Sequence, residues 1–328
     1  MSMTFLILNG FQLNPDYYGC PKDRASQPPG VQRPYWGVYF LLSGIFILML
    51  YIPCLVAIAT SQHMKSPAFK AMLVLGLYDI SSVFVNSVAT GILGLFGIAF
   101  CDFPRLNLFL GSIGLGSWMG CCISSMTLAV IRICDMSSNL KLRKWFDGRR
   151  INVCLFVFWA YGFGAALLSK PVVFTPVYMS WFFDPGVGKD PAIYVNLAHT
   201  FNNILMTVFT ILFYGYLSFL VIQESSASST NRFSNYQSSI LLQTFFFCIF
   251  HAIGSCLYAY MQFVSAPDFL ILVGQIAWQS SSGSVCVVYL TLNQTIRKSV
   301  IRLISPKRFA SGAQVTVVMP FDSRTQGM

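Results

Sequence analysis

Apolar residues gather in long runs along the chain, and short polar segments separate them. A helix that crosses a bilayer needs about 20 mostly apolar residues, because each residue adds about 1.5 Å of length. Seven runs are long enough, at residues 35–60, 70–98, 107–132, 151–169, 193–222, 238–263 and 269–292. The pattern predicts an all-α membrane protein, a seven-transmembrane helix bundle with its termini on opposite sides of the membrane.

Composition agrees with this pattern. Of the 328 residues, 55% are hydrophobic and only 10% are charged, whereas soluble domains carry about 25% charged residues. We expect three regions, namely an N-terminal segment 1–34, a helical domain 35–302 that includes a short helix after the last run, and a tail 303–328.

Basic residues are divided unevenly between the two sets of loops. If the N-terminus is outside, 15 of the 21 Lys and Arg residues fall in inner segments. The other six share the outer segments with six acids. Because membrane proteins keep positive charge on the cytoplasmic side, we expect the N-terminus outside and the C-terminus inside. The net charge of +10 then indicates contact with anionic membrane lipid and cytosolic partners, and no nucleic acid.

Two of the ten cysteines are set apart by position. Eight lie within the apolar runs or at their inner ends, where cysteine is usually a small packing residue. Only Cys20 and Cys101 fall on the predicted outer, oxidising side. A disulfide on that side would have to join these two, and the alternative is a pair of free thiols.

Polar residues form stripes within two of the runs. The second run carries Asp79, Ser82, Asn86 and Thr90 on one helical face. The last run repeats the pattern with Gln275, Gln279, Ser282, Cys286, Tyr289 and Asn293. Since polar groups are costly in a bilayer unless they face a partner or a cavity, we expect water-lined space inside the bundle. We assign a conformational network to Asp79, Ser82, Asn86, Tyr289 and Asn293; the alternative is a packing network without a switching role.

A ligand would enter through the outer half of the bundle. Aromatic walls with a few convergent polar groups are typical of small-molecule sites, and four runs supply such residues there. The candidate ligand-binding residues are Trp118, His199, Asn202, Asn203, His251, Tyr258, Gln262, Gln275 and Gln279. For each of them taken alone, an interhelical hydrogen bond is the alternative.

Catalysis finds little support in the sequence. The three histidines, His63, His199 and His251, fall at inner, outer and middle depths, so they cannot converge on one metal. We therefore expect no enzyme, no metal and no cofactor. A transporter would show several intramembrane ionisable groups or internal repeats, whereas Asp79 is the one acid within a run. A transporter or channel, or a non-signalling membrane scaffold, remains the alternative function.

Glycines crowd parts of the second and third runs. Gly116 and Gly120 form a GxxxG pair, and Gly91, Gly94 and Gly97 recur every three residues. Because they lie within apolar runs, close helix packing is a better interpretation than a nucleotide-binding loop.

Seven runs with Arg132 at the inner end of the third resemble a G-protein-coupled receptor. Several stretches more closely resemble the nematode serpentine receptor class T family. They are RPYWGVYFLLSGIFILMLYIPCLVAI (33–58), KAMLVLGLYDI (70–80), FCDFPRL (100–106), GLGSWMGCC (114–122), YVNLAHTFNNI (194–204) and YLTLNQTIRKSV (289–300). The resemblance implies a chemosensory receptor of the plasma membrane, in sensory-neuron cilia, with an external chemical ligand and a heterotrimeric G protein as partners.

The same resemblance assigns G-protein coupling to the inner end of the third run. The residues concerned are Arg132, Asp135, Lys141, Arg143 and Lys144. The sequence departs from the rhodopsin-like pattern, because Ile131 precedes the arginine where that pattern has an acid. The alternative is that Arg132 only anchors the helix by reaching lipid phosphates.

Overall fold

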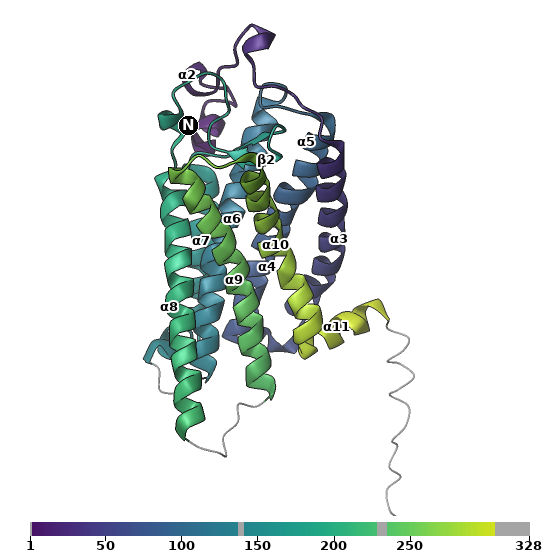
Figure 1. Ribbon diagram of the computed structural model, residues 1–328. Coiled ribbons are helices and arrows are strands. Elements are labelled where there is room, and N and C mark those ends of the chain that lie inside the picture. The colour runs from purple at the N-terminus through teal and green to yellow at the C-terminus, as the bar shows by residue number, and fades with distance from the viewer. Residues whose placement is uncertain (1, 137–140, 228–234, 306–328) are drawn as a thin grey trace, which may run out of the picture.

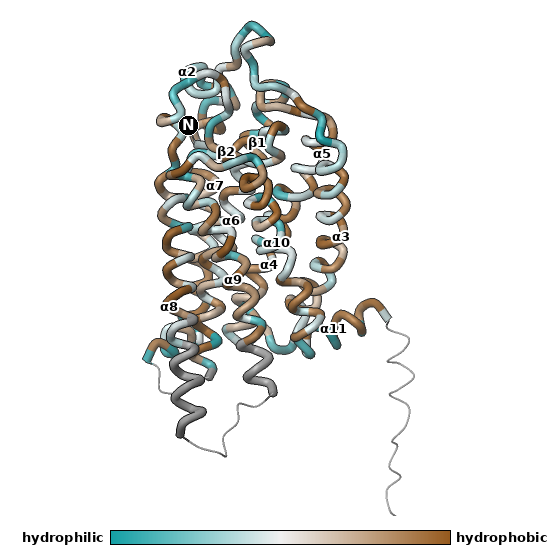
Figure 2. The backbone as a smooth tube through the Cα atoms, in the orientation of Figure 1, coloured by the Kyte–Doolittle hydropathy of each residue, from teal (hydrophilic) through white to brown (hydrophobic). Residues whose placement is uncertain are grey.

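The computed structural model describes residues 2–136, 141–227 and 235–305 of the chain. Long helices run side by side as an upright bundle (Figure 1). The N-terminal segment and the β-hairpin lie at one end of the bundle, and the short helix α11 projects sideways at the other. In Figure 2 hydrophobic residues predominate along the helices, and hydrophilic residues gather in the loops at the ends.

The bundle consists of seven membrane-length segments close to those predicted. They are α3 (Pro34–Ala59), α4 with η3 and α5 (Pro67–Phe96), α6 (Pro104–Met136), α7 (Arg150–Leu168), α8 (Leu197–Ala227), α9 (Asn235–Phe263) and α10 (Asp268–Leu292). Within the described residues, six of these are long and apolar enough to cross a membrane, and α8 contributes a shorter apolar stretch, Leu197–Phe213. The seven-helix fold class predicted from the sequence is therefore confirmed.

Local chemistry explains where the helices begin and end. Proline is the first residue of α3, α4 and α6, a position where its missing N–H costs no hydrogen bond. Helix α8 begins at Leu197, four residues after the predicted start at 193, because the Asn196 side chain accepts a hydrogen bond from the His199 backbone N–H at 3.2 Å. The preceding residues form the short helix η5 (Pro191–Tyr194).

The second membrane segment is interrupted by one wide turn that the sequence did not predict. Helix α4 (Pro67–Val83) passes through the π-helical turn η3 (Phe84–Ala89) into α5 (Thr90–Phe96). A π turn holds an additional residue, so both Asn86 and Ser87 are buried toward the bundle interior. Helix α5 ends at Phe96, and Gly97 caps it with a φ of 64°, a conformation that suits glycine.

A small cap of structure covers the end of the bundle where the N-terminal segment lies (Figure 1). We call this the outer end and the opposite one the inner end, following the orientation expected from the sequence. Strands β1 (Val173–Thr175) and β2 (Ser180–Phe182) form an antiparallel hairpin. The N-terminal segment contains α1 (Met3–Leu8), α2 (Pro15–Tyr18) and η1 (Arg24–Ser26). A disulfide joins Cys20 to Cys101, the pairing considered from the sequence. It ties the N-terminal segment to the loop before α6.

An aromatic cluster fills this cap. Tyr18 is buried between the rings of Phe100 and Tyr194. Burial raises the pKa of Tyr194 to about 12. Its hydroxyl donates a hydrogen bond to the backbone carbonyl of Tyr17.

Short helices close the opposite end. They are η2 (Gln62–Lys65), η4 (Lys141–Trp145) and α11 (Gln294–Ile304). Asn293 caps α11 by accepting a hydrogen bond from the Ile296 N–H at 3.1 Å, and Ile296 and Val300 turn their side chains into the core. Residues 306–328, which include most of the predicted tail, lie outside the described residues.

Candidate functional site

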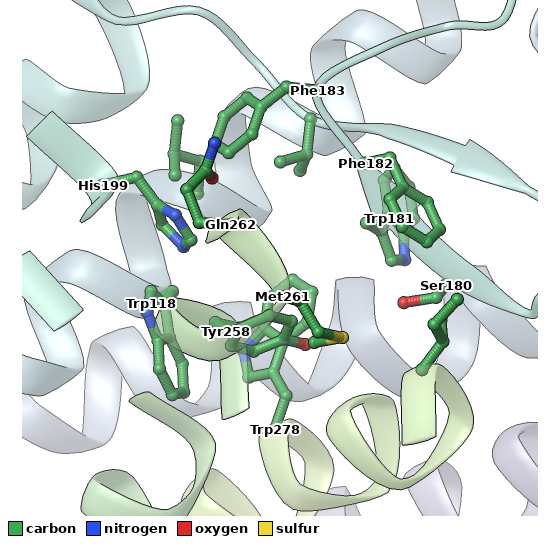
Figure 3. Close-up of a pocket in the computed structure, with 13 residues that line it drawn as sticks. Trp118, Ser180, Trp181, Phe182, Phe183, His199, Tyr258, Met261, Gln262 and Trp278 are labelled. Atoms are coloured by element: carbon green, nitrogen blue, oxygen red, sulfur yellow. The ribbon is translucent and has the colours of Figure 1, made fainter. Parts of the chain in front are cut away.

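A cavity of about 650 Å³, including its open mouth, lies at the outer end of the bundle. Helices α6, α8, α9 and α10 and the β-hairpin all contribute to its walls (Figure 3). The lining residues are Leu115, Trp118, Val172, Ser180, Trp181, Phe182, Phe183, His199, Tyr258, Met261, Gln262, Ile271 and Trp278.

The walls of the cavity are mainly aromatic rings that pack edge to face. The Trp118 ring lies 5.6 Å from the Tyr258 ring and 6.2 Å from the Trp278 ring, both close to perpendicular. The His199 ring lies 6.0 Å from Tyr258 and 5.2 Å from Phe183. Edge-to-face pairs are favourable because the positive edge of one ring meets the negative face of another. The walls are therefore well packed without a bound ligand.

Asn203 holds two of these rings in place from behind. Its side-chain oxygen accepts a hydrogen bond from the Trp118 indole at 2.9 Å. Its amide nitrogen lies 3.2 Å from the His199 ring nitrogen Nε2. The neighbouring Asn202 has a different partner and accepts a hydrogen bond from the Tyr161 hydroxyl at 3.1 Å.

The β-hairpin forms a roof that is fastened to the helices. The Trp181 indole donates to the Thr90 hydroxyl at 2.8 Å. The Ser180 hydroxyl donates to the side-chain oxygen of Gln275 at 3.3 Å, and the Gln275 amide donates to the backbone carbonyl of Asn86 at 2.8 Å. Through these bonds the roof is linked to the π turn.

The cavity contains no fully charged side chain. Its 13 described lining residues include no Lys, Arg, Asp or Glu. Ser180, Gln262, Tyr258 and His199 supply the polar groups that line it. This composition suits a ligand that is uncharged, mainly apolar and able to make one or two hydrogen bonds.

Four of the nine candidate ligand residues line this cavity: Trp118, His199, Tyr258 and Gln262. The other five, Asn202, Asn203, His251, Gln275 and Gln279, do not line it. These five make contacts within the protein instead, because a buried amide or imidazole needs partners. Gln279, for example, donates to the hydroxyls of Ser43 and Ser87 at 2.8 and 2.9 Å.

Sequence reasoning missed the roof of the cavity. Trp181, Phe182 and Phe183 are consecutive aromatic residues in an outer loop, and that run was a usable signal. It was passed over because polar residues within the apolar runs were given the most weight. Trp278, one position before Gln279, was missed for the same reason.

The polar stripes of the second and last membrane segments meet directly below the cavity. The Trp278 indole donates to the Ser82 hydroxyl at 2.8 Å, and the Asn86 amide lies 3.3 Å from that hydroxyl. One turn further in, the Tyr51 hydroxyl donates to Asp79, and the Cys121 thiol donates to the other Asp79 oxygen at 3.1 Å. The stripes thus bond to each other instead of facing a wide channel at these positions.

The network residues predicted nearer the inner end lie apart from these bonds. The Tyr289 ring packs edge to face on Tyr51, 6.3 Å away, and on Phe247, 5.5 Å away. Asn293 lies further in and donates to the Gln243 side chain at 3.2 Å. Tyr289 therefore packs against Tyr51, which is bonded to Asp79, and Asn293 caps α11.

Arg132 is buried near the inner end of α6, with 9% of its surface exposed. One guanidinium nitrogen lies 3.5 Å from the Met72 sulfur, and another lies 3.9 Å from the Asp135 carboxylate. Lys141, Arg143 and Lys144 lie nearby on the short helix η4. A side chain that served only to reach lipid phosphates would extend outward, so this burial favours a role inside the bundle.

Comparison with known proteins agrees with the fold and with the resemblance seen in the sequence. A family model described as serpentine type 7TM GPCR chemoreceptor Srt matches residues 1–313. Serpentine receptor class T-55 of Caenorhabditis elegans is 28% identical over 307 residues, which is 92% of this chain and 84% of that protein. A match over nearly the whole chain is decisive, and the chain belongs to the Srt family of serpentine seven-transmembrane chemoreceptors.

Proposed function

We propose that this protein is a plasma-membrane receptor that binds an external small molecule in the outer cavity and activates a heterotrimeric G protein. The main supporting observation is the uncharged aromatic cavity at one end of a seven-helix bundle, with a buried arginine near the other end. Membership of a chemoreceptor family supports the same reading. The N-terminus and the cavity face outside in this proposal, in accordance with the basic residues of the inner loops.

The lining of the cavity limits the chemical class of the ligand. An anion would need Lys or Arg, because an unpaired charge is costly in an apolar site, and a cation without a carboxylate would have only the faces of aromatic rings to offset its charge. The described lining includes none of these residues. We therefore assign an uncharged, mainly apolar organic molecule, held by Trp118, Trp278 and the hairpin and oriented by a polar group such as Gln262.

Contacts lead from the cavity toward the inner end in two steps. Trp118, at the cavity wall, stacks on His251 with ring centroids 6.0 Å apart. Trp278 donates to Ser82, which lies one helical turn from Asp79. A ligand that displaces Trp118 would change the packing of α9 against α6, and one that displaces Trp278 would change the packing of α10 against α4. Ligand binding acts only through a difference in affinity between two arrangements of these helices.

The inner end of α6 is the proposed contact for the G protein. Arg132 lies between Met72 and Asp135, and we assign this position to the resting arrangement. Its release on activation would present five N–H donors beside the basic residues Lys141, Arg143 and Lys144. Such a surface suits an acidic or carboxylate-bearing partner segment.

The proposal is tested by a screen of uncharged organic compounds on cells that express the receptor together with a broadly coupling G protein. Ile271 is buried and lines the cavity, so Ile271→Trp should fill the cavity and abolish the response to every active compound. Val273, two residues away, is 44% exposed on the outside of the bundle. Val273→Trp should respond like wild type.

Two results would contradict this function. If Ile271→Trp reaches the surface and responds like wild type, the ligand does not bind in this cavity. If compounds cause current or uptake without added G protein, the protein is a channel or transporter, the alternative drawn from its sequence.

A further inference from the structure

Three potential metal ligands from three helices meet in the centre of the bundle. They are Asp79 of α4, Cys121 of α6 and His251 of α9, and one ligand atom from each lies within 4.8 Å of the other two. All three side chains are completely buried. The group lies below the outer cavity, on the far side of Trp118 from the proposed ligand.

The orientation of His251 leaves one ring nitrogen available. Nδ1 lies 2.8 Å from the backbone carbonyl of Phe247. A carbonyl only accepts hydrogen bonds, so Nδ1 carries the proton and Nε2 keeps its lone pair. Within the part of the chain that the structure describes, Nε2 has no hydrogen-bond partner, although it is buried. A histidine that binds a metal through one nitrogen usually donates from the other to a carbonyl or carboxylate.

The other two residues are also held by hydrogen bonds. Tyr51 donates a hydrogen bond to the Asp79 carboxylate and so fixes its orientation. The Cys121 sulfur lies 3.1 Å from the second carboxylate oxygen. The Ser282 hydroxyl lies beside both residues and makes no well-directed hydrogen bond to any described residue. The Ser282 hydroxyl can therefore bind a metal ion at a fourth coordination position, or hold a water molecule that does so.

The chemistry of the three ligands selects the type of ion. Na⁺, Mg²⁺ and Ca²⁺ prefer oxygen ligands, whereas this group offers one sulfur, one nitrogen and one carboxylate. Sulfur and imidazole ligands in tetrahedral geometry suit Zn²⁺. A zinc ion bound to ionised Asp79 and Cys121 gives a neutral site, which removes the cost of an isolated charge in the bilayer.

From these observations we infer that Asp79, Cys121 and His251 form a zinc-class binding site that links α4, α6 and α9. Binding forms bonds from the metal to sulfur, nitrogen and oxygen and releases the Cys121 proton to solvent. Zinc bonds of about 2.0–2.3 Å place tetrahedral ligand atoms roughly 3.5 Å apart. The Cys121 sulfur is 3.1 Å from Asp79 and no two of the three ligand atoms are more than 4.8 Å apart, so binding needs side-chain shifts on the order of 1 Å. This inference does not depend on the ligand or the G protein.

The test uses the full-length receptor, purified in nanodiscs, treated with a chelator and then incubated with metal until binding is complete. We expect one zinc ion for each chain. At a zinc concentration about 100-fold above Kd, the midpoint of thermal unfolding should rise by about 5 °C or more. Co²⁺ should bind in place of zinc and produce the sulfur-to-cobalt charge-transfer absorption of a thiolate ligand.

A neighbouring cysteine supplies the matched control. Cys122 is also completely buried, but it faces Asn202 and Ser255 and is not part of the group. Cys121→Ser should lose the charge-transfer absorption and bind zinc at least about tenfold more weakly. Cys122→Ser should keep both properties. His251→Gln should reduce zinc binding, whereas His63→Gln, at the inner end of the bundle, should not.

Several outcomes would overturn the inference. One is a spectrum of the cobalt-loaded wild type without sulfur-to-cobalt absorption. This measurement does not depend on whether any variant folds. Another is equal zinc affinity in wild type and Cys121→Ser. A stabilising effect of Na⁺ as large as that of Zn²⁺ would show a site made of oxygen ligands only and would also reject the assignment.

Discussion

Arg132 is the residue whose position most needs a physical explanation. It lies near the end of a long apolar helix, yet it is largely buried, next to Met72 and one helical turn from Asp135. Burial of a guanidinium is costly unless its donors find partners. A restrained cation near the inner end has the properties needed for a contact that is released on activation.

The first prediction concerns this arginine. Arg132→Ala should abolish ligand-driven G-protein activation, while ligand affinity changes by less than about tenfold, or about 1.4 kcal/mol. Arg132→Lys keeps the charge but loses the planar fork of donors, so it should restore surface delivery better than signalling. Surface labelling, radioligand binding and nucleotide exchange measure the three quantities. If both variants signal like wild type, Arg132 is only an anchor.

The second prediction separates two adjacent asparagines. Asn203→Ala removes the acceptor for the Trp118 indole, and an unsatisfied buried donor costs about 1–3 kcal/mol. Because Trp118 lines the cavity, the ligand concentration for half-maximal response should rise by about tenfold or more. Asn202→Ala loses the bond to Tyr161 and a longer bond to the Asn203 side chain. It keeps the acceptor for the Trp118 indole and should leave potency nearly unchanged. Equal effects of the two changes would show that Asn203 does not position the cavity wall.

The sequence indicated which residues belong to the outer half of the bundle, but not which neighbours their side chains contact. Of the candidate ligand-binding residues, Trp118, His199, Tyr258 and Gln262 line the cavity. Gln275 and Gln279 share a helix with Trp278 but turn toward α3 and the π turn. The direction of a side chain depends on which helices are adjacent, and a single sequence does not contain that information.

At the scale of elements, glycines set how closely two helices approach. A Cβ at Gly116 of α6 would lie 2.6 Å from the Ala166 Cβ and 2.7 Å from the Gly162 carbonyl oxygen of α7. These are contacts with backbone and a rigid methyl group, so the helices would have to move apart. Gly164, also on α7, would place a Cβ within 4 Å of no atom.

The third prediction uses this pair. Gly116→Ala should destabilise the purified receptor by about 1–3 kcal/mol, because it overpacks a tight contact. Gly164→Ala should be neutral or stabilise it by up to about 1 kcal/mol, because alanine favours helix. Thermal unfolding in the same detergent compares the two. A Gly116→Ala variant as stable as wild type would mean that α6 and α7 are not closely packed there.

The seven membrane segments were predicted within a few residues, since length and hydropathy determine them. The π turn at 84–89 was not, because it differs from an α-helix by only one additional residue. The β-hairpin was also missed: its strands have three residues each, too few for an alternating pattern. Both unpredicted elements lie at or beside the cavity, where local rules are most often overridden by packing.

At the scale of the whole molecule, the disulfide and the aromatic cluster hold the outer cap on the bundle. Cys20 and Cys101 are 81 residues apart. Closing such a long loop restricts the unfolded chain, and removal of a native disulfide typically costs about 2–5 kcal/mol. The cap includes the hairpin that roofs the cavity. Loss of the disulfide should therefore affect both delivery to the cell surface and ligand binding.

The fourth prediction tests this bridge together with the orientation. After mild reduction of intact cells, a membrane-impermeant maleimide should label Cys20 and Cys101, and without reduction it should label neither. The double variant Cys20→Ser, Cys101→Ser should reach the surface in smaller amounts, whereas Cys256→Ser, at an exposed free cysteine, should not. Labelling of both thiols without reduction would reject the bridge, and absence of labelling after reduction would reject an outside N-terminus.

The central claim is that a molecule in the outer cavity and a G protein at the inner end bind the same arrangement of the helices. Coupling between two sites is reciprocal. If the ligand raises the affinity for the G protein by some factor, a bound G protein must raise the affinity for the ligand by the same factor. The direct measurement is the Kd of an active compound for purified receptor, with and without nucleotide-free G protein. The account predicts tighter binding with G protein, by about 5- to 150-fold, and no such change in Arg132→Ala. An unchanged Kd in wild type, with both proteins folded, would contradict it.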